Sequence, residues 1–172
     1  ALFMAVKNYY NMASWTEWPE DIKMREDSAV RRWERKLRNE IRFWKFVQFK
    51  FYEQWEKFRA YVNSLGIKIL GDMPIYVAMD SADTWANPEL FQLYDDADPI
   101  AVAGCPPDYF SETGQLWGNP LYNWKNHEKN GFQWWIARVR HQLNLTDYLR
   151  IDHFRGLEAY WSIPAEEETA LN

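Results

Sequence analysis

An arginine, an aspartate and a histidine stand close together in the segment Tyr148-Leu-Arg-Ile-Asp-His-Phe154. Its first five residues are typical of a short strand. Side chains alternate between the two faces of a strand, so Arg150 and Asp152 should point the same way, about 6.5 to 7 Å apart. The C-terminal end of a parallel strand is where α/β barrels and doubly wound sheets place their active sites. A purely structural arginine–aspartate pair is the alternative, and His153 could bind a substrate.

A second aspartate, Asp72, follows the apolar run Ile67-Lys-Ile-Leu70, and Gly71 gives the backbone room to turn beside it. Pro74 interrupts any regular continuation, so we predict a buried strand that ends near Gly71 and Asp72. Two aspartates at the ends of two strands would face one pocket. Taken alone, Asp72 is explained equally well as a residue that caps its strand.

The stretch from Cys105 to Tyr122 places flat aromatic rings beside amide and carboxylate groups. A sugar has apolar C–H faces and a rim of hydroxyl groups, so this combination suits carbohydrate binding. The candidate residues are Asp108, Tyr109, Phe110, Gln115, Trp117 and Asn119. The alternative is a loop that is packed down by its own aromatic side chains.

The composition narrows the classes of ligand. The chain of 172 residues contains 11 Trp, 10 Tyr and 10 Phe, more than packing alone requires, and ring-rich surfaces suit stacking ligands. Its net charge of -5, with acidic and basic residues interspersed, gives no positive stripe for nucleic acid. No apolar run approaches the roughly 18 residues of a membrane span. A single cysteine rules out an internal disulfide and favours a reducing, cytoplasmic location.

Neither a metal nor a cofactor is expected. The sequence contains no HExxH, paired CxxC, P-loop, GxGxxG or Gly-x-Ser-x-Gly motif, which argues against metalloprotease, nucleotide-binding and α/β-hydrolase functions. His127 and His141 have no partner at ligand spacing, and we predict that both lie on the surface. The run Glu166-Glu-Glu168 is predicted to be a solvated turn rather than a metal site.

The elements that must position these residues begin with a helix. Apolar residues recur every three or four positions over residues 28–63, which predicts one long helix whose aromatic stripe belongs to the core. Asp27 or Ser28 could cap its start, and Gly66 could end it.

Further helices and strands alternate along the chain. A helix is predicted over Gly131–Leu145, directly before the strand at residues 148–152, and Phe154–Trp161 is predicted to start the next helix. Such alternation favours a parallel α/β sheet or barrel. Residues 79–130 show little periodicity and are predicted to form a long functional loop region.

Both ends of the chain suggest a piece of something longer. The sequence opens without Met, inside an apolar periodic stretch, and stops after Glu-Glu-Glu-Thr-Ala-Leu-Asn172 without a finishing element. We therefore expect it to be part of a longer protein.

Long motifs in the chain are similar to those of a known enzyme family. They are Arg150-Ile-Asp-His-Phe-Arg-Gly-Leu-Glu-Ala-Tyr-Trp-Ser-Ile-Pro-Ala165, Phe46-Val-Gln-Phe-Lys-Phe-Tyr-Glu-Gln-Trp55, and the stretches Gly71–Phe91 and Val102–Tyr122. All of them resemble the amylomaltases, which are 4-alpha-glucanotransferases also called disproportionating enzymes. The similarity covers nearly the whole chain.

The resemblance implies that residues 1–172 are an incomplete catalytic domain, part of a (β/α)8 barrel of the α-amylase type. It implies that Asp152 is the nucleophile of a retaining double displacement and forms a β-glucosyl-enzyme intermediate. Arg150 would orient that carboxylate and keep it ionised. Asp72 and His153 would lie near the donor sugar. The family's active-site loop, which lies against the glucan, would supply Asp108, Tyr109, Phe110, Trp117 and Asn119.

Retaining chemistry also needs a second carboxyl group about 5 to 5.5 Å from the nucleophile. In the family that glutamate lies on the following strand, beyond Asn172, and neither Glu158 nor Glu166 sits in its motif. The whole protein is therefore expected to transfer 1,4-alpha-glucan segments to glucose or a maltooligosaccharide, and the 172-residue chain alone is expected to be inactive. A hydrolytic α-amylase relative and a non-catalytic carbohydrate-binding module are the alternatives. The oligomeric state stays open.

Overall fold

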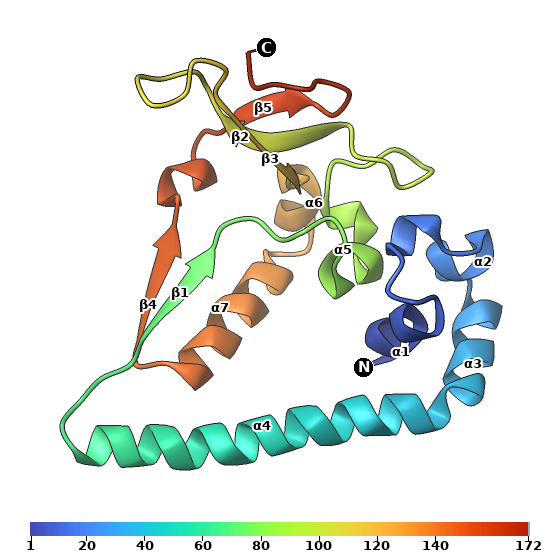
Figure 1. Ribbon diagram of the computed structural model, residues 1–172, viewed down its shortest axis with the longest axis vertical. Helices are drawn as coiled ribbons and strands as arrows, with labels where there is room; N and C mark the ends of the chain where they lie inside the picture. Colours follow the sequence, from blue (N-terminus) through green and yellow to red (C-terminus); the bar gives the residue numbers. More distant parts are fainter. Residues whose placement is uncertain (172) are drawn as a thin grey trace. The chain divides into compact units, whose positions relative to one another are not determined.

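Two short strands carry the charged residues with which the sequence analysis began. In the computed structural model, which describes residues 1–171, β4 is Tyr148–Asp152, as predicted, and it pairs with β1, Leu70–Pro74. The two arrows point the same way in Figure 1, so the pair is parallel. Exposed and half-buried residues alternate along β4, which confirms that Arg150 and Asp152 share one face.

The chain divides into two compact units, each described by itself below. Unit 1 comprises residues 1–71 and 140–149, and unit 2 comprises residues 72–139 and 150–172. The strands β1 and β4 and the helix α7, Gln133–Leu145, each contribute residues to both units. Helix α7 confirms the helix predicted directly before β4. Among residues 1–171, no helix combines the length and the apolar composition needed to cross a bilayer.

Helices make up most of unit 1. They are α1 (Leu2–Tyr9), the 3-10 turn η1 (Trp15–Glu17), α2 (Glu20–Lys23), α3 (Asp27–Lys36) and α4 (Arg38–Ser64). The helix predicted over residues 28–63 is therefore two helices, separated at Leu37, whose φ of -106° and ψ of 30° leave the helical region.

Packing explains the break between α3 and α4. Leu37 is buried, and on α3 the ring of Trp33 lies 4.9 Å from that of Tyr9 in α1. The turn at Leu37 lets α3 contact α1 and α2 while α4 leaves in another direction (Figure 1). The apolar periodicity continues across Leu37, so the sequence pattern predicted a single helix.

The two ends of this helical pair differ in how they are capped. Gly66 follows α4 with a positive φ of 77°, and the amides of Gly66 and Ile67 donate to carbonyls in the last turn, which confirms the predicted stop. At the start, the cap predicted at Asp27 or Ser28 is wrong. The residue before α3 is Glu26, which forms no capping hydrogen bond. Asp27 is already in the first turn, where its negative charge interacts favourably with the positive end of the helix dipole.

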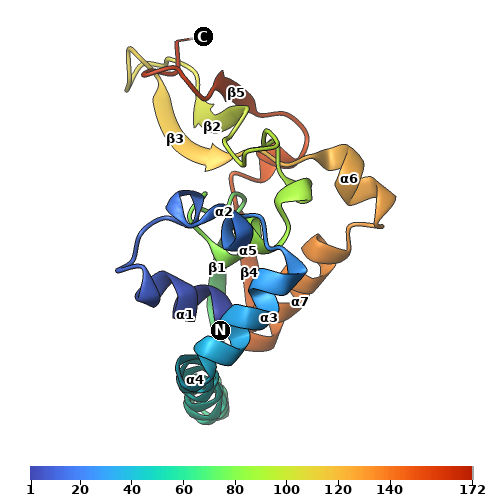
Figure 2. The same cartoon turned by 90° about the vertical axis from the view of Figure 1, so that its right-hand side faces the viewer.

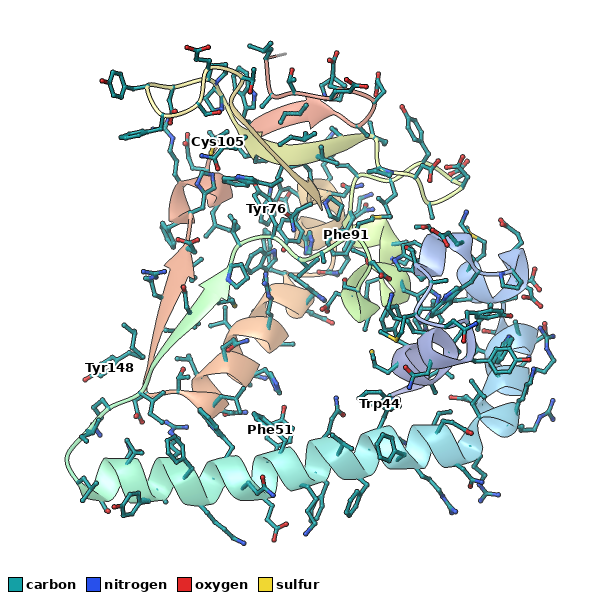
Figure 3. The ribbon with its side chains drawn as sticks, in the orientation of Figure 1. Trp44, Phe51, Tyr76, Phe91, Cys105 and Tyr148 are labelled. Carbon is teal, nitrogen blue, oxygen red and sulfur yellow. The ribbon has the colours of Figure 1, made fainter. Side chains whose placement is uncertain are left out.

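The aromatic stripe of α4 is not buried. Phe51 is 48% exposed and Phe58 is 52% exposed, and Figure 3 shows Trp44 and Phe51 on the same side of the helix. Some rings on this side still make long-range contacts: the indole N–H of Trp55 donates to the carbonyl of Leu145 over 2.8 Å. The prediction that the stripe over residues 28–63 belongs to the core is therefore wrong for α4, whereas Trp33 and Leu37, which precede α4, are buried.

One carboxylate, Asp147, joins three segments of unit 1. Its Oδ1 accepts from Arg59 Nη2 at 2.8 Å, and its Oδ2 accepts from Asn63 Nδ2 and from the amide of Ile69, each at 2.8 Å. The Ile69 amide, then Asn63 and Arg59, hold the pKa of Asp147 well below its usual range. Helix α4 and the residues that precede β1 and β4 are thus fixed to one side chain.

Replacing Asp147 with asparagine should lower the stability of the chain at neutral pH. The variant loses the charge that three donors stabilise, and we expect Tm at pH 7 to fall by about 5 °C in circular-dichroism melts. A lowered folded-state pKa gives stabilisation that is present above the ordinary aspartate pKa of about 4 and is lost as the pH falls. The difference in Tm between the wild-type chain and Asp147→Asn should therefore become smaller as the pH falls from about 4 to about 2. The exposed Asp95, changed to asparagine, is the matched control, and an unchanged Tm at pH 7 for Asp147→Asn would contradict this role.

Unit 2 contains a three-stranded antiparallel sheet. Strand β2 (Ala101–Cys105) lies between β3 (Gln115–Pro120) and β5 (Trp161–Pro164), as Figures 1 and 2 show. Gly104 faces Leu116 in β3 and Trp161 in β5. A Cβ at Gly104 would collide with the carbonyl oxygen of the β3 residue Gln115, so glycine permits the close approach of these strands.

This sheet corrects two expectations. Residues 79–130 are not one loop region, because they hold β2 and β3 as well as α5 (Ala82–Ala86), the turn η2 (Pro88–Leu90) and α6 (Trp124–Lys129). The helix predicted from Phe154 is only a 3-10 turn, η3 (Phe154–Leu157), because the chain then joins the sheet as β5. Strand β2 reads Ala-Val-Ala-Gly-Cys, without the bulky alternation that indicates a strand, and its partner β5 lies far along the chain.

Tyr122 lies at the centre of an aromatic core in unit 2. It is 1% exposed, and its ring contacts those of Tyr76, Phe91, Trp124, His127, Trp134 and Trp135. His127 is fully buried, so its predicted surface position is wrong. Its Nε2–H donates to the carbonyl of Leu90, and burial lowers its pKa. His141 is exposed, as predicted.

Candidate active site

The guanidinium of Arg150 pairs with the carboxylate of Asp72. Nε donates to Oδ1 over 3.0 Å and Nη2 donates to Oδ2 over 2.6 Å, so the pair is bidentate. These bonds and the negative charge of Asp72 raise the pKa of Arg150, which stays charged. Asp72 lies inside β1 rather than just past a strand end, which corrects that expectation. The strand continues to Pro74, where the missing N–H ends it.

Asp152, the last residue of β4, is held much more loosely. Its Oδ1 lies 4.0 Å from Nη2 of Arg150, and 66% of its side chain is exposed. Arg150 therefore supplies positive charge near Asp152 and directed hydrogen bonds to Asp72. The carboxylate of Asp152 keeps its lone pairs available for a ligand.

His153 follows Asp152 in a left-handed backbone conformation, with φ of 50° and ψ of 45°. This region is uncommon for residues other than glycine and occurs where surrounding contacts enforce it. The imidazole meets the indole of Trp117 at a ring-centroid distance of 5.2 Å and an interplanar angle of 89°. The left-handed turn at His153 therefore coincides with a contact between His153, directly after β4, and Trp117 in β3.

A cavity of about 160 Å³ lies at this end of β4 in unit 2. Its walls combine a carboxylate, an imidazole, an amide and two aromatic rings. The lining residues are Pro74, Ile75, Tyr76, Trp117, Asn119, Asp152 and His153. Flat rings beside hydrogen-bonding groups suit a sugar ring. A second cavity of about 350 Å³ shares His153 with the first and includes Cys105, Arg155, Tyr160 and Trp161 in its wall.

The structure separates the predicted loop residues into two groups. Trp117 and Asn119, both on β3, line the cavity with Asp152, and the Asn119 side-chain amide also donates to the carbonyl of Val77 over 2.9 Å. Tyr109 and Phe110 are 98% and 90% exposed and lie on neither cavity wall.

Asp108 belongs with the exposed pair. Its Oδ1 accepts from the amides of Phe110 and Ser111, each at 2.9 Å, so it shapes the turn of the loop that carries Tyr109 and Phe110. The predicted stacking platform is therefore represented in the cavity by Trp117 alone.

Tyr76 is a cavity residue that the sequence analysis missed. It is 6% exposed, and its hydroxyl has no hydrogen-bond partner among residues 1–171. Its position two residues after Pro74 places it just beyond the end of β1 (Figure 3). Its position directly after a strand end could have identified Tyr76 as a candidate, because α/β folds place site residues there.

The chemistry available here is that of a carboxylate next to a ring-lined cavity. Within the described residues no three side chains of His, Cys, Asp or Glu are grouped so as to hold a metal ion. Asp152 can act as a nucleophile or as an electrostatic partner of a developing cation.

Comparison with known proteins identifies the family. The sequence matches glycoside hydrolase family 77, 4-alpha-glucanotransferase, over residues 1–172. The chain belongs to the 4-alpha-glucanotransferase family. This confirms the resemblance that its long motifs indicated.

Its relatives in this family are closely similar. The chain is 56% identical over 172 residues to the 4-alpha-glucanotransferase of Aquifex aeolicus and 50% identical over 173 residues to that of Clostridium butyricum. Each match covers 100% of this chain but 35% and 36% of those proteins. The chain therefore spans about a third of the length of these relatives.

Solved structures of amylomaltases share the fold. The amylomaltase from Streptococcus agalactiae in complex with acarbose matches with a TM-score of 0.95 and 46% identity, over 99% of this chain and 34% of that one. The amylomaltase from Corynebacterium glutamicum, at 19% identity, shares only the fold, with a TM-score of 0.67 over 98% of this chain and 21% of that one. The predicted α/β class is thereby confirmed.

The hydrogen bond from Arg150 Nε to Asp72 can be tested directly. In a ¹H–¹⁵N spectrum of arginine side chains, we expect the Arg150 Nε–H signal to be shifted downfield and protected from exchange, because it donates to a carboxylate. Asp72→Ala should abolish this signature. Asp152→Ala is the matched control and should preserve it, because Asp152 contacts Nη2 only at 4.0 Å. The reverse pattern would show that Asp152, not Asp72, is the partner of Arg150.

Proposed function

We propose that this chain supplies the nucleophile side of the active site in a 4-alpha-glucanotransferase whose catalytic domain is a (β/α)8 barrel. The observation that carries the proposal is the position of Asp152, an exposed carboxylate at the end of a parallel strand and in the wall of a ring-lined cavity. Active sites of such barrels lie at this end of the strands. Residues 1–172 would form part of that barrel domain.

The geometry favours Asp152 over Asp72 as the nucleophile. Both oxygens of Asp72 accept hydrogen bonds from Arg150, which engages their lone pairs and fixes their orientation. Asp152 has only the longer contact and keeps its oxygens free. Arg150, already paired with Asp72, still places a positive charge 4.0 Å from Asp152.

The reaction would be a retaining double displacement on a 1,4-alpha-glucan. An oxygen of Asp152 attacks the anomeric carbon, the glycosidic C–O bond breaks, and the leaving oxygen takes a proton from a carboxylic acid supplied by another part of the protein. The resulting β-glycosyl ester is then attacked by the 4-hydroxyl of glucose or a maltooligosaccharide. That hydroxyl returns its proton to the same carboxylate, the ester C–O bond to Asp152 breaks and frees its carboxylate, and a new α-1,4 bond forms.

The remaining cavity residues would bind the donor sugar. Trp117 offers a ring face to the apolar C–H face of a pyranose, and His153 and Asn119 offer polar atoms to its hydroxyl groups. Asp72 would act near the donor through Arg150. Tyr109 and Phe110, exposed on their loop, would lie against more distant glucosyl units.

Location and competing functions follow from the same reasoning. We propose a cytoplasmic location, which the single cysteine supports, although one relative from Solanum tuberosum is named as chloroplastic or amyloplastic. A hydrolytic relative would release the glycosyl group to water, and a non-catalytic binding module would not depend on Asp152. Family membership favours the transferase.

A chimaera tests the function. The 172 residues replace the equivalent third of the Aquifex aeolicus enzyme, which is 56% identical, and products from maltotriose are measured with and without added glucose. We expect glucose and longer maltooligosaccharides, and Asp152→Asn should reduce kcat by about 10⁴-fold or more because the covalent route is lost. Asp95→Asn should keep full activity. Unchanged transfer in Asp152→Asn would exclude this nucleophile, and release of glucose and maltose without longer products would indicate a hydrolase.

The 172-residue chain on its own should be inactive. Loss of the general acid typically removes about 10² to 10⁴ in rate, and the chain carries no residue that matches the family's acid/base motif. Incubation of the purified chain with maltotriose should therefore yield no glucose above the level of its Asp152→Asn variant. Glucosyl transfer by the chain alone would contradict this expectation and point to an acid within residues 1–172.

A further inference from the structure

Gly156 leaves the space that the ring of His153 occupies. Gly156 is buried, and a Cβ at this position would lie 2.8 Å from Cδ2 of His153 and 2.9 Å from Cδ1 of Ile75. Real Cβ atoms essentially never approach other heavy atoms below 3.0 Å, so a side chain here would displace one of these neighbours. The absence of a side chain therefore allows the imidazole to lie over the η3 turn.

Tyr76 supports His153 indirectly, through the ring of Trp117. The buried ring of Tyr76 lies 6.3 Å from the ring of Trp117, which in turn meets His153 at 5.2 Å. Beneath it, the ring of Tyr122 lies 6.0 Å from Tyr76 at an interplanar angle of 22°. Four rings thus form a continuous row from the core of unit 2 to His153.

The base of this row is anchored to the backbone. The Tyr122 hydroxyl donates to the carbonyl of Ile75 over 2.6 Å, and Arg138 donates to the same carbonyl over 2.9 Å and to that of Pro74 over 2.6 Å. These carbonyls belong to the end of β1 and the residue after it. The row of rings is consequently fixed to the same strand that carries Asp72.

The hydroxyl of Tyr76 lies beside Gly156 but adds no hydrogen bond to this support. It has no hydrogen-bond partner within residues 1–171, and burial, with smaller effects from Tyr160 and Cys105, raises the pKa of Tyr76 to about 12. The ring, which remains in a phenylalanine, makes the contacts with Trp117 and Tyr122. Phenylalanine should therefore substitute for tyrosine in positioning, whereas leucine should not.

We propose that Gly156 and Tyr76 are positioning residues that hold His153 as the wall between the two cavities of unit 2. The imidazole is the residue that both cavities share, with Asp152 on one side and Cys105, Tyr160 and Trp161 on the other. Displacing the imidazole would merge the cavities and remove a contact from the donor sugar. The effect on catalysis rests on the proposed function, whereas the effect on the position of His153 does not.

Histidine-ring NMR of the 172-residue chain tests the positioning without any activity. Trp117→Leu defines where the His153 ring signals fall when the neighbouring indole is absent. Gly156→Ala and Tyr76→Leu should move these signals toward that reference, and Tyr76→Phe should restore them. Gly131→Ala is the matched glycine control, because a Cβ there meets nothing within 4 Å and only its positive φ of 66° is strained. If Gly156→Ala fails to fold, the two Tyr76 variants decide, and signals that stay in place in Tyr76→Leu would overturn the proposal.

Kinetics of the chimaera provide a second readout. A merely structural defect lowers the amount of active enzyme and leaves KM unchanged. We expect Gly156→Ala and Tyr76→Leu to raise KM for maltotriose and to lower kcat/KM by about 10-fold to 100-fold, with rescue by Tyr76→Phe. An unchanged KM in active variants would overturn the proposal. An inactive wild-type chimaera would count against the proposed function instead, and the NMR result would then decide the positioning.

Discussion

The two parallel hydrogen bonds between Arg150 and Asp72 set the arrangement of charge on which the candidate site depends. They join β4 to β1 at the face that carries the acidic groups, and they engage both oxygens of one aspartate while leaving those of Asp152 free. The side chains are 62% and 54% exposed, so the pair contributes little to the stability of the fold. Its importance is geometric. A lysine would keep the charge but could not form this planar fork.

Aromatic packing positions the uncharged side chains of the site, as the ion pair positions the charged ones. Tyr122 is buried at the base, Tyr76 and Trp117 continue the row of rings, and His153 stands at its end with a strained backbone. Rings in contact transmit position well, because packed interiors have few voids to absorb a displacement. Part of the abundance of Trp, Tyr and Phe in this chain therefore supports the candidate site.

Local patterns in the sequence predicted the charged face well and the sheet of unit 2 poorly. The strand Tyr148–Asp152 and its alternation could be read from five residues, because a strand's faces depend only on parity. The separation of α3 from α4 could not be predicted, because Leu37 is apolar and continues the helical spacing of apolar residues. The helix ends there because of tertiary packing. Strand β2 has small side chains and a distant partner, so nothing local marked it. His127 looked like a surface residue because its polar neighbours in sequence do not reveal the aromatic core around it.

Cys105 gives this chain a practical property. It is the only cysteine in the sequence, it is half-buried, and it lies in the wall of the cavity that shares His153 with the candidate site. A spectroscopic label attached to its sulfur would lie in the wall of that cavity without any engineered thiol or cysteine deletion. Burial raises the pKa of this thiol, so labelling at neutral pH would be slow, and occupancy of the cavity would slow it further. The rate of alkylation at this one atom would therefore report whether the cavity is occupied.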